Sequence, residues 1–420
     1  MSKPPRVGII GMGGFAGSHQ GTVARLEERG LIRLVCTCDP NLAAFAVQQQ
    51  GWRFAARHVR VFDDYLAMLE ACHSDLDYVA VPTPIHLHAE MHAAITARRL
   101  PAYLEKPPTL DYAELERMIA DDARPAKSSL VGFNFIVEKA RLALKERILA
   151  GEFGAVRGGT LSAAWPRPAD YFRRSAWAGR LVVDGRIVLD SCFGNAMAHF
   201  VHNLLFWTGG PGLFSWAEIV AVRAELYRAH QIEGADTFFV EADTANGRTL
   251  RFALSHACAG ASTHSETILC DRAVVRYVVG GIVEITWVDG RVDRIANEPF
   301  DGLAENHLEF GRYLSGESTR PATTLADCRP FVALNDLAHI SSGRITPFAP
   351  NLVQPVRDEK DQKHYLSVVD LAGAMDRFLT QGIWPGANGW GREAPEVVTP
   401  ADLSRFHDVV HAMAAQARPG

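Results

Sequence analysis

Three polar side chains recur at helical spacing in the segment FGNAMAHFVHNLLFW, residues 193–207. Asn195, His199 and His202 follow one another at steps of four and three residues, which place side chains on one face of a helix. An imidazole can take or release a proton near neutral pH, and a neighbouring amide can orient the ring without adding charge. The stripe has three interpretations: a substrate wall, a group of hydrogen-bonded core residues, or a metal site that also uses Asp190.

A glycine-rich turn near the N-terminus provides a second group of candidate residues. In VGIIGMGGFAG, Gly11, Gly13 and Ala16 form the pattern G-x-G-x-x-A between an apolar run and an amphipathic segment. Gly11 permits a tight turn, Gly13 allows a pyrophosphate to approach the backbone, and Ala16 allows close helix packing. Asp39 ends the next apolar run, where an acid can accept hydrogen bonds from an adenosine ribose and repel a 2′-phosphate. The pattern therefore predicts a dinucleotide site that favours NAD, with NADP possible, over an unrelated glycine turn.

The tripeptide Glu105-Lys106-Pro107 directly follows a short apolar run at residues 102–104. Ligands of open α/β sheets bind at the carboxyl ends of the strands, so a lysine there would lie near a nicotinamide. The positive charge of that ring can lower the pKa of the ammonium group and make it a usable proton shuttle. Taken alone, the tripeptide favours a surface Glu–Lys pair before a turn, so its meaning depends on the surrounding elements.

The composition of the 420-residue chain is that of a globular protein long enough for two domains, with 48% hydrophobic and 22% charged residues. The net charge of -5 and the absence of a Lys/Arg run argue against nucleic-acid binding. No apolar run is long enough to span a membrane, and the N-terminus lacks the apolar core of a signal peptide. Seven scattered cysteines favour reduced thiols in a cytoplasmic protein.

Strand and helix patterns alternate over the first 130 residues. Strands are expected at residues 6–10, 31–38, 76–81, 102–104 and 128–133. Helices are expected at residues 16–28, 41–50, 63–72, 87–99 and 111–121. Such alternation predicts a doubly wound parallel sheet with helices on both faces.

The pattern changes after Gly132, where long strands without crossover helices run from residue 216 to 295. These strands predict an open, mainly antiparallel or mixed sheet in an α+β domain. Helices are expected at residues 138–149, 193–207, 303–314, 324–340 and 365–379, with a terminal helix after Thr399-Pro400. We expect domains at residues 1–130 and 131–350, followed by a helical extension at 351–420 that packs on the core.

Several of these motifs together resemble one known family. GMGGFAG, the acid Asp39, VPTPIHLHAEMHAAI, EKP, VGFNF, ILAGEFGAVRGG and ENHLEFGRYLSG look like segments of the glucose–fructose oxidoreductase/inositol dehydrogenase/MocA (Gfo/Idh/MocA) family over residues 5–345. The resemblance implies an N-terminal Rossmann domain and a C-terminal domain with an open sheet. It also implies NAD(P)-dependent oxidation or reduction of a sugar, polyol or related hydroxy compound, and a homo-dimer or tetramer formed through that sheet.

The resemblance assigns catalytic roles by position. Lys106 falls on the family's catalytic lysine, and His199 falls on the histidine of its D-x-x-x-H-x-x-D helix. Asn195 stands at the first acid of that pattern and His202 at the second. An amide can orient an imidazole but cannot stabilise its charged form, so we expect His199 to be a weak base that leaves most proton handling to Lys106.

The resemblance also assigns binding residues. The residues expected to bind the cofactor are Gly11, Gly13, Gly14, Phe15, Ala16, Asp39, Pro82, Thr83, Pro84, His88, Glu105 and Lys106. The residues expected to contact substrate are Tyr171, Arg173, Trp177 and His202. A structural role at a helix start is an equal alternative for His88. No metal is expected, because a third ligand beside the two histidines is not evident.

Two other functions compete with a dehydrogenase. Some relatives use transient oxidation by bound NAD to cleave a glycoside, and others lose catalysis and act as cofactor-binding regulators. The altered residues Asn195 and His202 favour the regulator, whereas the retained Glu105-Lys106-Pro107 argues against it.

Overall fold

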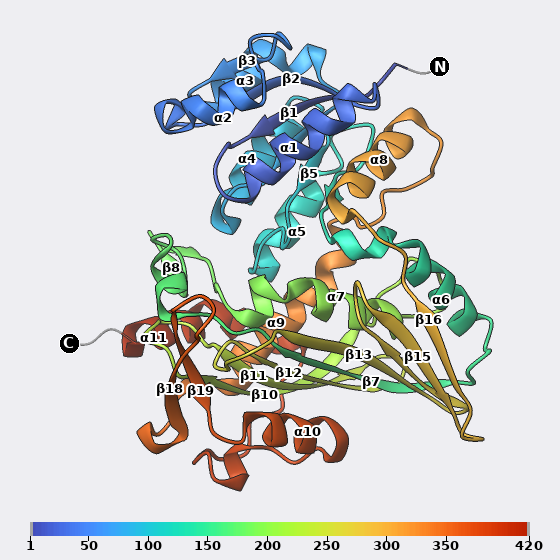
Figure 1. Cartoon of the computed structure of the whole chain (residues 1–420), viewed down its shortest axis with the longest axis vertical. Coiled ribbons are helices and arrows are strands. Elements are labelled where there is room, and N and C mark those ends of the chain that lie inside the picture. The colour runs from blue at the N-terminus through green and yellow to red at the C-terminus, as the bar shows by residue number, and fades with distance from the viewer. Residues whose placement is uncertain (1–2, 418–420) are drawn as a thin grey trace. The chain divides into compact units, whose positions relative to one another are not determined.

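The computed structural model describes residues 3–417, which form two compact units (Figure 1). Unit 1 contains the residues up to 109 together with 113–139 and 300–328, and unit 2 contains 110–112, 140–299 and the residues from 329 onward. Residues 300–328, which the sequence placed in the second domain, thus group with the first. Among residues 3–417, no helix is long and apolar enough to cross a membrane.

Unit 1 is built on a parallel sheet in the order β3-β2-β1-β4-β5-β6. The strands are β1 (Arg6–Ile10), β2 (Arg33–Cys38), β3 (Arg60–Phe62), β4 (Tyr78–Val81), β5 (Ala102–Leu104) and β6 (Leu130–Val131). The connecting helices are α1 (Phe15–Glu28), α2 (Ala46–Gly51), α3 (Tyr65–Cys72), α4 (His88–Ala97) and α5 (Tyr112–Asp121). The prediction of a doubly wound parallel sheet is confirmed. The strand order reverses between β1 and β4, which is where such sheets bind their ligands.

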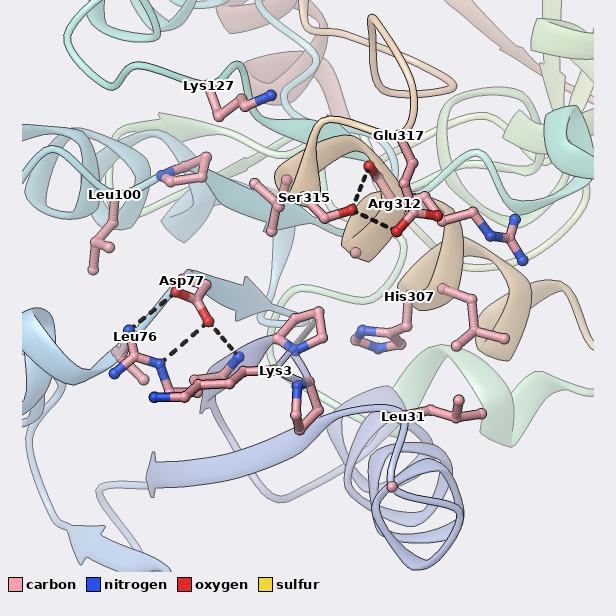
Figure 2. Close-up of a pocket in the computed structure, with 18 of the residues that line it drawn as sticks. Lys3, Leu31, Leu76, Asp77, Leu100, Lys127, His307, Arg312, Ser315 and Glu317 are labelled. Atoms are coloured by element: carbon pink, nitrogen blue, oxygen red, sulfur yellow. Dashed lines mark hydrogen bonds and ion pairs between the residues drawn. The ribbon is translucent and has the colours of Figure 1, made fainter. Parts of the chain in front are cut away.

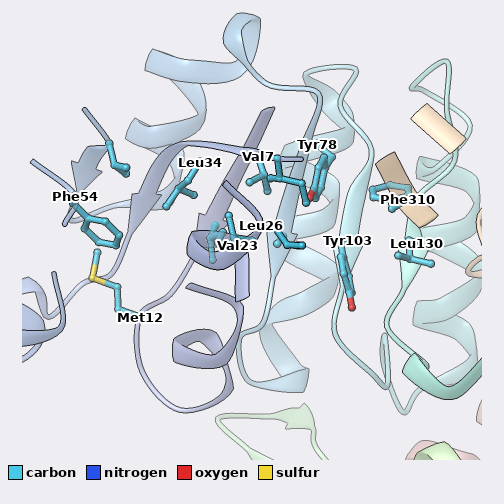
Figure 3. Close-up of a cluster of buried hydrophobic side chains, with 14 of the residues drawn as sticks. Val7, Met12, Val23, Leu26, Leu34, Phe54, Tyr78, Tyr103, Leu130 and Phe310 are labelled. Carbon is cyan, nitrogen blue, oxygen red and sulfur yellow. The ribbon is translucent and has the colours of Figure 1, made fainter. Parts of the chain in front are cut away.

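The core of unit 1 explains why residues 300–328 belong to it. Helix α8 (Gly302–Ser315) contributes Phe310 to the cluster of buried side chains around β1, β4 and β5 (Figure 3). The ring of Phe310 contacts the ring of Tyr78 edge-on, with 5.1 Å between their centroids. Burial of a phenylalanine of this kind stabilises a fold by about 1.5–3 kcal/mol, so α8 is part of the first domain's core.

Unit 2 is built on a mixed sheet in the order β16-β15-β14-β13-β7-β12-β11-β10-β17. The strands are β7 (Val156–Ala164), β10 (Ile219–Arg228), β11 (Thr237–Thr244), β12 (Thr249–Ser255), β13 (Thr263–Cys270), β14 (Ala273–Tyr277), β15 (Ile282–Trp287), β16 (Val292–Ala296) and β17 (Ile345–Pro347). The pairs β7–β12 and β10–β17 are parallel, and the other described neighbours are antiparallel. This confirms the mainly antiparallel sheet expected from the sequence.

Helices cover unit 2 on both faces of this sheet. Helices α7 (Ala198–Trp207) and α9 (Arg329–Ser342) lie on one face, and α10 (Leu371–Gln381) lies on the other (Figure 1). Helix α6 (Lys139–Leu149) precedes β7, and a short hairpin joins β8 (Val182–Val183) to β9 (Arg186–Ile187). The first of these faces therefore carries the helix that holds two of the predicted site residues.

The extension at residues 351–420 differs from the predicted helical segment. The helix expected at residues 365–379 is wrong at its start, because His364–Val368 is strand β19, paired with β18 (Val353–Arg357). Asp370 follows with a φ of 55°, a left-handed conformation that separates this strand from α10. The Thr-Pro pair starts the 3-10 helix Pro400–Arg405, with a capping box formed by Thr399 and Asp402, and the final helix α11 (Phe406–Ala417) begins only after it.

A buried ion pair joins α6 to the sheet of unit 2. Arg141 Nη1 donates to Glu266 Oε2 at 2.7 Å, and both side chains are fully buried. Glu266 also accepts hydrogen bonds from Asn203 and Trp207 of α7, and the Arg141 guanidinium lies 4.7 Å from the centre of the Trp207 ring. The pair thus links α6, α7 and β13 through one carboxylate.

We expect Arg141→Met to lower the free energy of unfolding by about 3–5 kcal/mol, because it leaves the Glu266 carboxylate buried without its counter-charge. Urea unfolding followed by tryptophan fluorescence measures the change. Arg157→Met is the matched control, because Arg157 pairs with Asp271 on the surface and its loss is expected to leave stability close to wild type. Equal effects of the two substitutions would contradict the role of burial.

Candidate active site

The turn between β1 and α1 is built mainly from glycines, Gly11, Gly13 and Gly14. Gly11 has a φ of +107°, and a Cβ at this position would lie 3.2 Å from the Cβ of Ala16. Gly14 has a φ of +53° and precedes Phe15, the first residue of α1, and no side chain within residues 3–417 caps this helix start. These features fit a phosphate group at the helix N-terminus. A Cβ at Gly13 would also lie 2.9 Å from the Phe45 ring, a packing constraint that the sequence did not reveal.

Asp39 anchors the other side of this turn. Its Oδ2 accepts a hydrogen bond from the Met12 amide at 2.9 Å, and its Oδ1 accepts one from the Asn41 amide at 2.9 Å. These two backbone donors fix the position of the carboxylate beside the glycine turn. The residues therefore fit the NAD group that the motif predicted, with a fixed acid available to the adenosine ribose.

Glu105 is held at the carboxyl end of β5. Its Oε2 lies 3.2 Å from the Lys106 amide nitrogen, which donates to it, and its Oε1 lies 3.0 Å from His19 Nε2 on α1. A Cβ at Gly132 would lie 2.8 Å from the Tyr103 ring and 3.0 Å from the same Oε1, so a larger residue there would crowd this carboxylate. Lys106 itself is half-buried. The sequence did not single out His19, since its contact with Glu105 spans 86 residues.

His88 connects the two loops of the predicted cofactor site. It is the first residue of α4, and its Nε2 lies 2.8 Å from the Thr83 carbonyl oxygen in the loop Pro82–Pro84. Its Nδ1 lies 3.0 Å from the carbonyl oxygen of Pro107. Burial lowers the pKa of His88, so the neutral ring donates from one nitrogen at a time. These contacts favour a positioning role for His88.

The segment at residues 193–207 is not the single helix that its spacing predicted. Cys192–Ala196 forms a π-helical turn, closed by a hydrogen bond from the Met197 amide to the Cys192 carbonyl at 2.8 Å, and α7 begins only at Ala198. The wider turn changes the angular spacing of side chains, so Asn195 and His199 do not follow one regular helical stripe. The physical reason lies at Ser191, whose hydroxyl accepts a hydrogen bond from the Gly194 amide and starts the turn early.

Asn195 is bound to a carboxylate that the sequence had considered only as a metal ligand. Its Nδ2 donates to Asp190 Oδ1 at 2.7 Å, and Asp190 Oδ2 accepts from the Gly179 amide at 2.7 Å. Arg174 Nη2 lies 3.4 Å from the same Oδ2. Asp190 therefore joins the position-195 amide to the loop that the resemblance assigned to substrate binding.

Aromatic rings in this loop gather around Arg174. Its guanidinium lies 3.8 Å from the centre of the Tyr171 ring and 4.9 Å from the Trp177 ring, which are cation–π distances. Arg173, which the sequence singled out, is exposed at the end of the 3-10 turn Ala169–Arg173. No signal in the sequence distinguishes the two neighbouring arginines.

His199 and His202 occupy different environments on α7. His199 is half-buried, whereas His202 is fully buried and its ring lies 5.0 Å from that of Trp216. Burial lowers the pKa of His202 well below its usual range, so the ring is neutral. This environment favours packing behind the substrate wall over contact with substrate. Among residues 3–417 no group of three His, Cys, Asp or Glu side chains could hold a metal.

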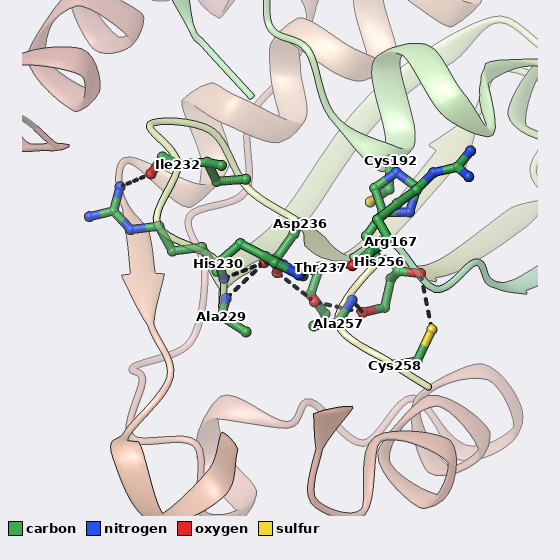
Figure 4. A network of polar contacts seen from close by, with 12 residues as sticks. Arg167, Cys192, Ala229, His230, Ile232, Asp236, Thr237, His256, Ala257 and Cys258 are labelled. Atoms are coloured by element: carbon green, nitrogen blue, oxygen red, sulfur yellow. Dashed lines mark hydrogen bonds and ion pairs between the residues drawn. The ribbon is translucent and has the colours of Figure 1, made fainter. Parts of the chain in front are cut away.

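A buried polar network holds the start of the same loop (Figure 4). Asp236 accepts from His230 Nδ1 at 2.7 Å, and His230 Nε2 lies 3.1 Å from the Arg167 carbonyl oxygen. Burial alone would raise the pKa of Asp236, but hydrogen bonds from His230 and the backbone lower it. His256 Nδ1 lies 2.8 Å from the Trp165 carbonyl oxygen, and burial lowers the pKa of His256 to about 3. His256 thus holds the loop at Trp165.

The doubly wound sheet, its glycine-rich turn and the anchored acid define a dinucleotide-binding protein, and comparisons with known proteins identify the family. Residues 5–133 match the profile described as "Oxidoreductase family, NAD-binding Rossmann fold", and residues 142–276 match the profile described as "GFO/IDH/MocA C-terminal domain". Together they cover more than half of the chain. The protein belongs to the Gfo/Idh/MocA family and is an NAD(P)-dependent oxidoreductase.

Solved structures with the same fold include the WlbA dehydrogenase from Bordetella pertussis in complex with NADH and UDP-GlcNAcA. It is 23% identical, with a TM-score of 0.66 over 81% of this chain and 96% of that chain. A putative myo-inositol dehydrogenase from Sinorhizobium meliloti is 20% identical, with a TM-score of 0.61 over 80% and 97%. Levoglucosan dehydrogenase in complex with NADH is 15% identical, with a TM-score of 0.68 over 81% and 97%. The sequence has no match among curated proteins.

We expect Asn195→Asp to place a second carboxylate against Asp190, where an N–H···O hydrogen bond of 2.7 Å now lies. Two carboxylates this close cannot both ionise, so the pKa of one rises above its unfolded value of about 3.9. The penalty in the free energy of unfolding is then absent below about pH 4 and grows as the pH rises towards the raised pKa. Thermal unfolding of wild type and variant from pH 4 to pH 8 measures it.

The pH–rate profile is the second readout, and we expect it to move in Asn195→Asp. Asn388→Asp adds the same charge at an exposed site and serves as the control. An unchanged profile in Asn195→Asp would contradict the idea that this position tunes His199.

Proposed function

We propose that the protein transfers a hydride between NAD and a hydroxyl-bearing carbon of a sugar, polyol or related compound. The observation that carries the proposal is Glu105-Lys106, held by hydrogen bonds at the carboxyl end of β5 in an NAD-binding domain. UDP-GlcNAcA, myo-inositol and levoglucosan in the names of the structural neighbours support a carbohydrate-like substrate.

Proton transfer in this proposal is the task of Lys106. When bound, NAD accepts the hydride, and the hydroxyl proton must leave at the same carbon centre. Lys106 takes this proton as the main acid/base, and His199 assists it. Asn195 orients His199 while its own amide is held by Asp190. NADP is a less favoured carrier, because the anchored Asp39 carboxylate would repel a 2′-phosphate.

The substrate class follows from the loop around Arg174. Arg174 lies against the rings of Tyr171 and Trp177, and its guanidinium can bind a hydroxyl or a carboxylate of a sugar. Arg173 is exposed beside them and adds a second cation. The fully buried His202 packs behind the substrate-facing side of α7 and does not bind the sugar directly.

We expect Lys106→Ala to lower kcat by about 10²–10⁴-fold and to leave NAD affinity nearly unchanged, since general acid–base catalysis contributes a factor of this size. A panel of sugars and polyols, read by the absorbance of reduced nicotinamide, measures turnover, and cofactor fluorescence measures binding. Lys360→Ala, on an exposed turn, is the matched control.

Each outcome of this panel separates the candidate functions. Retained turnover in Lys106→Ala would contradict the assigned role. Net glycoside cleavage without net cofactor reduction would indicate the glycosidase. NAD binding without turnover of any compound in the panel would favour the regulator.

The proposal includes a homo-dimer or tetramer formed through the sheet of unit 2. Leu269, Val274, Thr286 and Val292 pair across β13 to β16, so their side chains share one face. Leu269, Val274 and Val292 are exposed there, whereas α10 covers β12 and β7 farther along the sheet. This apolar row supports a second copy of the chain as its cover. The seven free cysteines support a cytoplasmic location.

We expect Val274→Glu to shift the protein to a smaller species at micromolar concentration, because the substitution would bury an unpaired charge in the dimer interface. Light scattering after gel filtration measures the mass. Val47→Glu is the control, since Val47 is equally apolar and is exposed on α2 of unit 1. A wild type that elutes as a monomer, or a variant with unchanged mass, would contradict this interface.

A further inference from the structure

Four buried side chains of unit 1 form a continuous line of hydrogen bonds that ends at Glu105. Glu105 Oε1 lies 3.0 Å from His19 Nε2, and His19 Nδ1 lies 3.1 Å from His307 Nε2. His307 Nδ1 lies 2.9 Å from the hydroxyl oxygen of Tyr78. His19, His307 and Tyr78 are fully buried, and Glu105 is 5% exposed. The four residues come from α1, α8, β4 and the end of β5, so the line exists only in the folded unit.

Counting hydrogens along this line determines which atom donates at each step. Burial raises the pKa of the Tyr78 phenol, so Tyr78 keeps its hydrogen. His307 Nδ1 lies within hydrogen-bond distance of this buried hydroxyl, and donation to it leaves no buried hydrogen unpaired. Burial also lowers the pKa of His307 well below its usual range, so this ring carries one hydrogen, which must be on Nε2. His307 Nε2 therefore donates to His19 Nδ1. His19 in turn carries its hydrogen on Nε2 and donates it to Glu105.

Solvent does not offer these rings other partners. His307 contributes to the wall of a groove of about 1090 Å³ lined by Lys3, Lys127 and Arg312 (Figure 2). Yet the ring itself is fully buried, and its two nitrogens are taken by Tyr78 and His19. Tyr78 thus sets which atom donates and which accepts at each hydrogen bond of the line. Its ring packs against Phe310 in the core (Figure 3).

We propose that Tyr78, His307 and His19 are positioning residues that hold the Glu105 carboxylate in place as a hydrogen-bond acceptor next to Lys106. The inference rests on the proposed role of Lys106 as the acid/base. A neutral His–His pair has two hydrogen orders, and a structural contact alone would tolerate either. The Tyr78 hydroxyl selects the order in which every hydrogen points towards Glu105. The carboxylate so held sets the basicity of the adjacent lysine.

The groups that face Glu105 are few. They include His19 from α1, His88 from the start of α4, Tyr103 on β5 and the backbone amide of Lys106. His88 and Tyr103 are kept neutral by burial, which lowers the pKa of His88 and raises that of Tyr103. Loss of the His19 hydrogen bond would release the Glu105 carboxylate from its fixed place and weaken its effect on Lys106. Lys106 would then lose its proton at lower pH, and the acidic limb of the kcat profile would move to lower pH.

Tyr78→Phe removes one hydroxyl group and leaves the ring. We expect the acidic limb of its kcat profile for alcohol oxidation to move down by about one pH unit, with NAD affinity changed by less than about twofold. His307→Leu should do the same. His307→Gln should restore the wild-type limb, because a Gln amide can accept from Tyr78 and donate to His19. Phe310→Leu loosens the packing around Tyr78 but removes no hydrogen-bonding group of the line, so it should lower Tm and leave the limb in place.

Nitrogen-15 NMR of the wild-type histidines tests the hydrogen order without any substitution. We expect His19 and His307 to be protonated on Nε2, and a His307 protonated on Nδ1 would overturn the inference. An acidic limb of the kcat–pH profile that stays at the wild-type pH in both Tyr78→Phe and His307→Leu would also overturn it. Lys106→Ala separates this failure from that of the proposed function. If Lys106→Ala is inactive while the acidic limbs of Tyr78→Phe and His307→Leu stay at the wild-type pH, only the inference fails. If Lys106→Ala retains activity, the proposed function itself fails.

Discussion

Each candidate functional side chain depends on one constraint, namely that a buried polar group must find its partners inside the protein. An unpartnered buried donor or acceptor costs about 1–3 kcal/mol, and a buried charge costs more. Glu105 meets this constraint through His19, Asn195 meets it through Asp190, and the substrate loop meets it through Asp236. The same hydrogen bonds that avoid the cost also fix where the reactive groups lie. Positioning and stability are therefore one requirement in this molecule.

Patterns that act over a few residues were readable from the sequence. Alternating strands and helices predicted the doubly wound sheet, and β1 and β5 begin and end at the expected residues. The positive φ of Gly11 follows from the tight turn that its motif requires. These features depend on local conformational preferences and on periodic burial, which a single chain displays directly.

Contacts between distant residues were not readable in this way. His19 meets His307 across 288 residues, and α8 joins the core of unit 1 after the chain has passed through unit 2. The sequence also treated residues 193–207 as a regular helix, because apolar spacing cannot show the π-helical turn that Ser191 starts. At His364–Val368 a strand replaced the expected helix, since pairing with β18 outweighs weak local preference.

The amide at position 195 is best understood together with its partner. Compared with the family pattern, Asn195 removes a carboxylate one turn before His199. In the folded chain, however, Asp190 brings a carboxylate to within 2.7 Å of that amide. The chain thus keeps a carboxylate in this region, at Asp190, which is hydrogen-bonded to the amide at position 195. This carboxylate is also shared with the Gly179 amide and with Arg174, which lies between the two aromatic rings of the loop. An aspartate at 195 would compete with Asp190 for the same donors, so asparagine is the residue that allows this loop and the π-helical turn before α7 to share one acid.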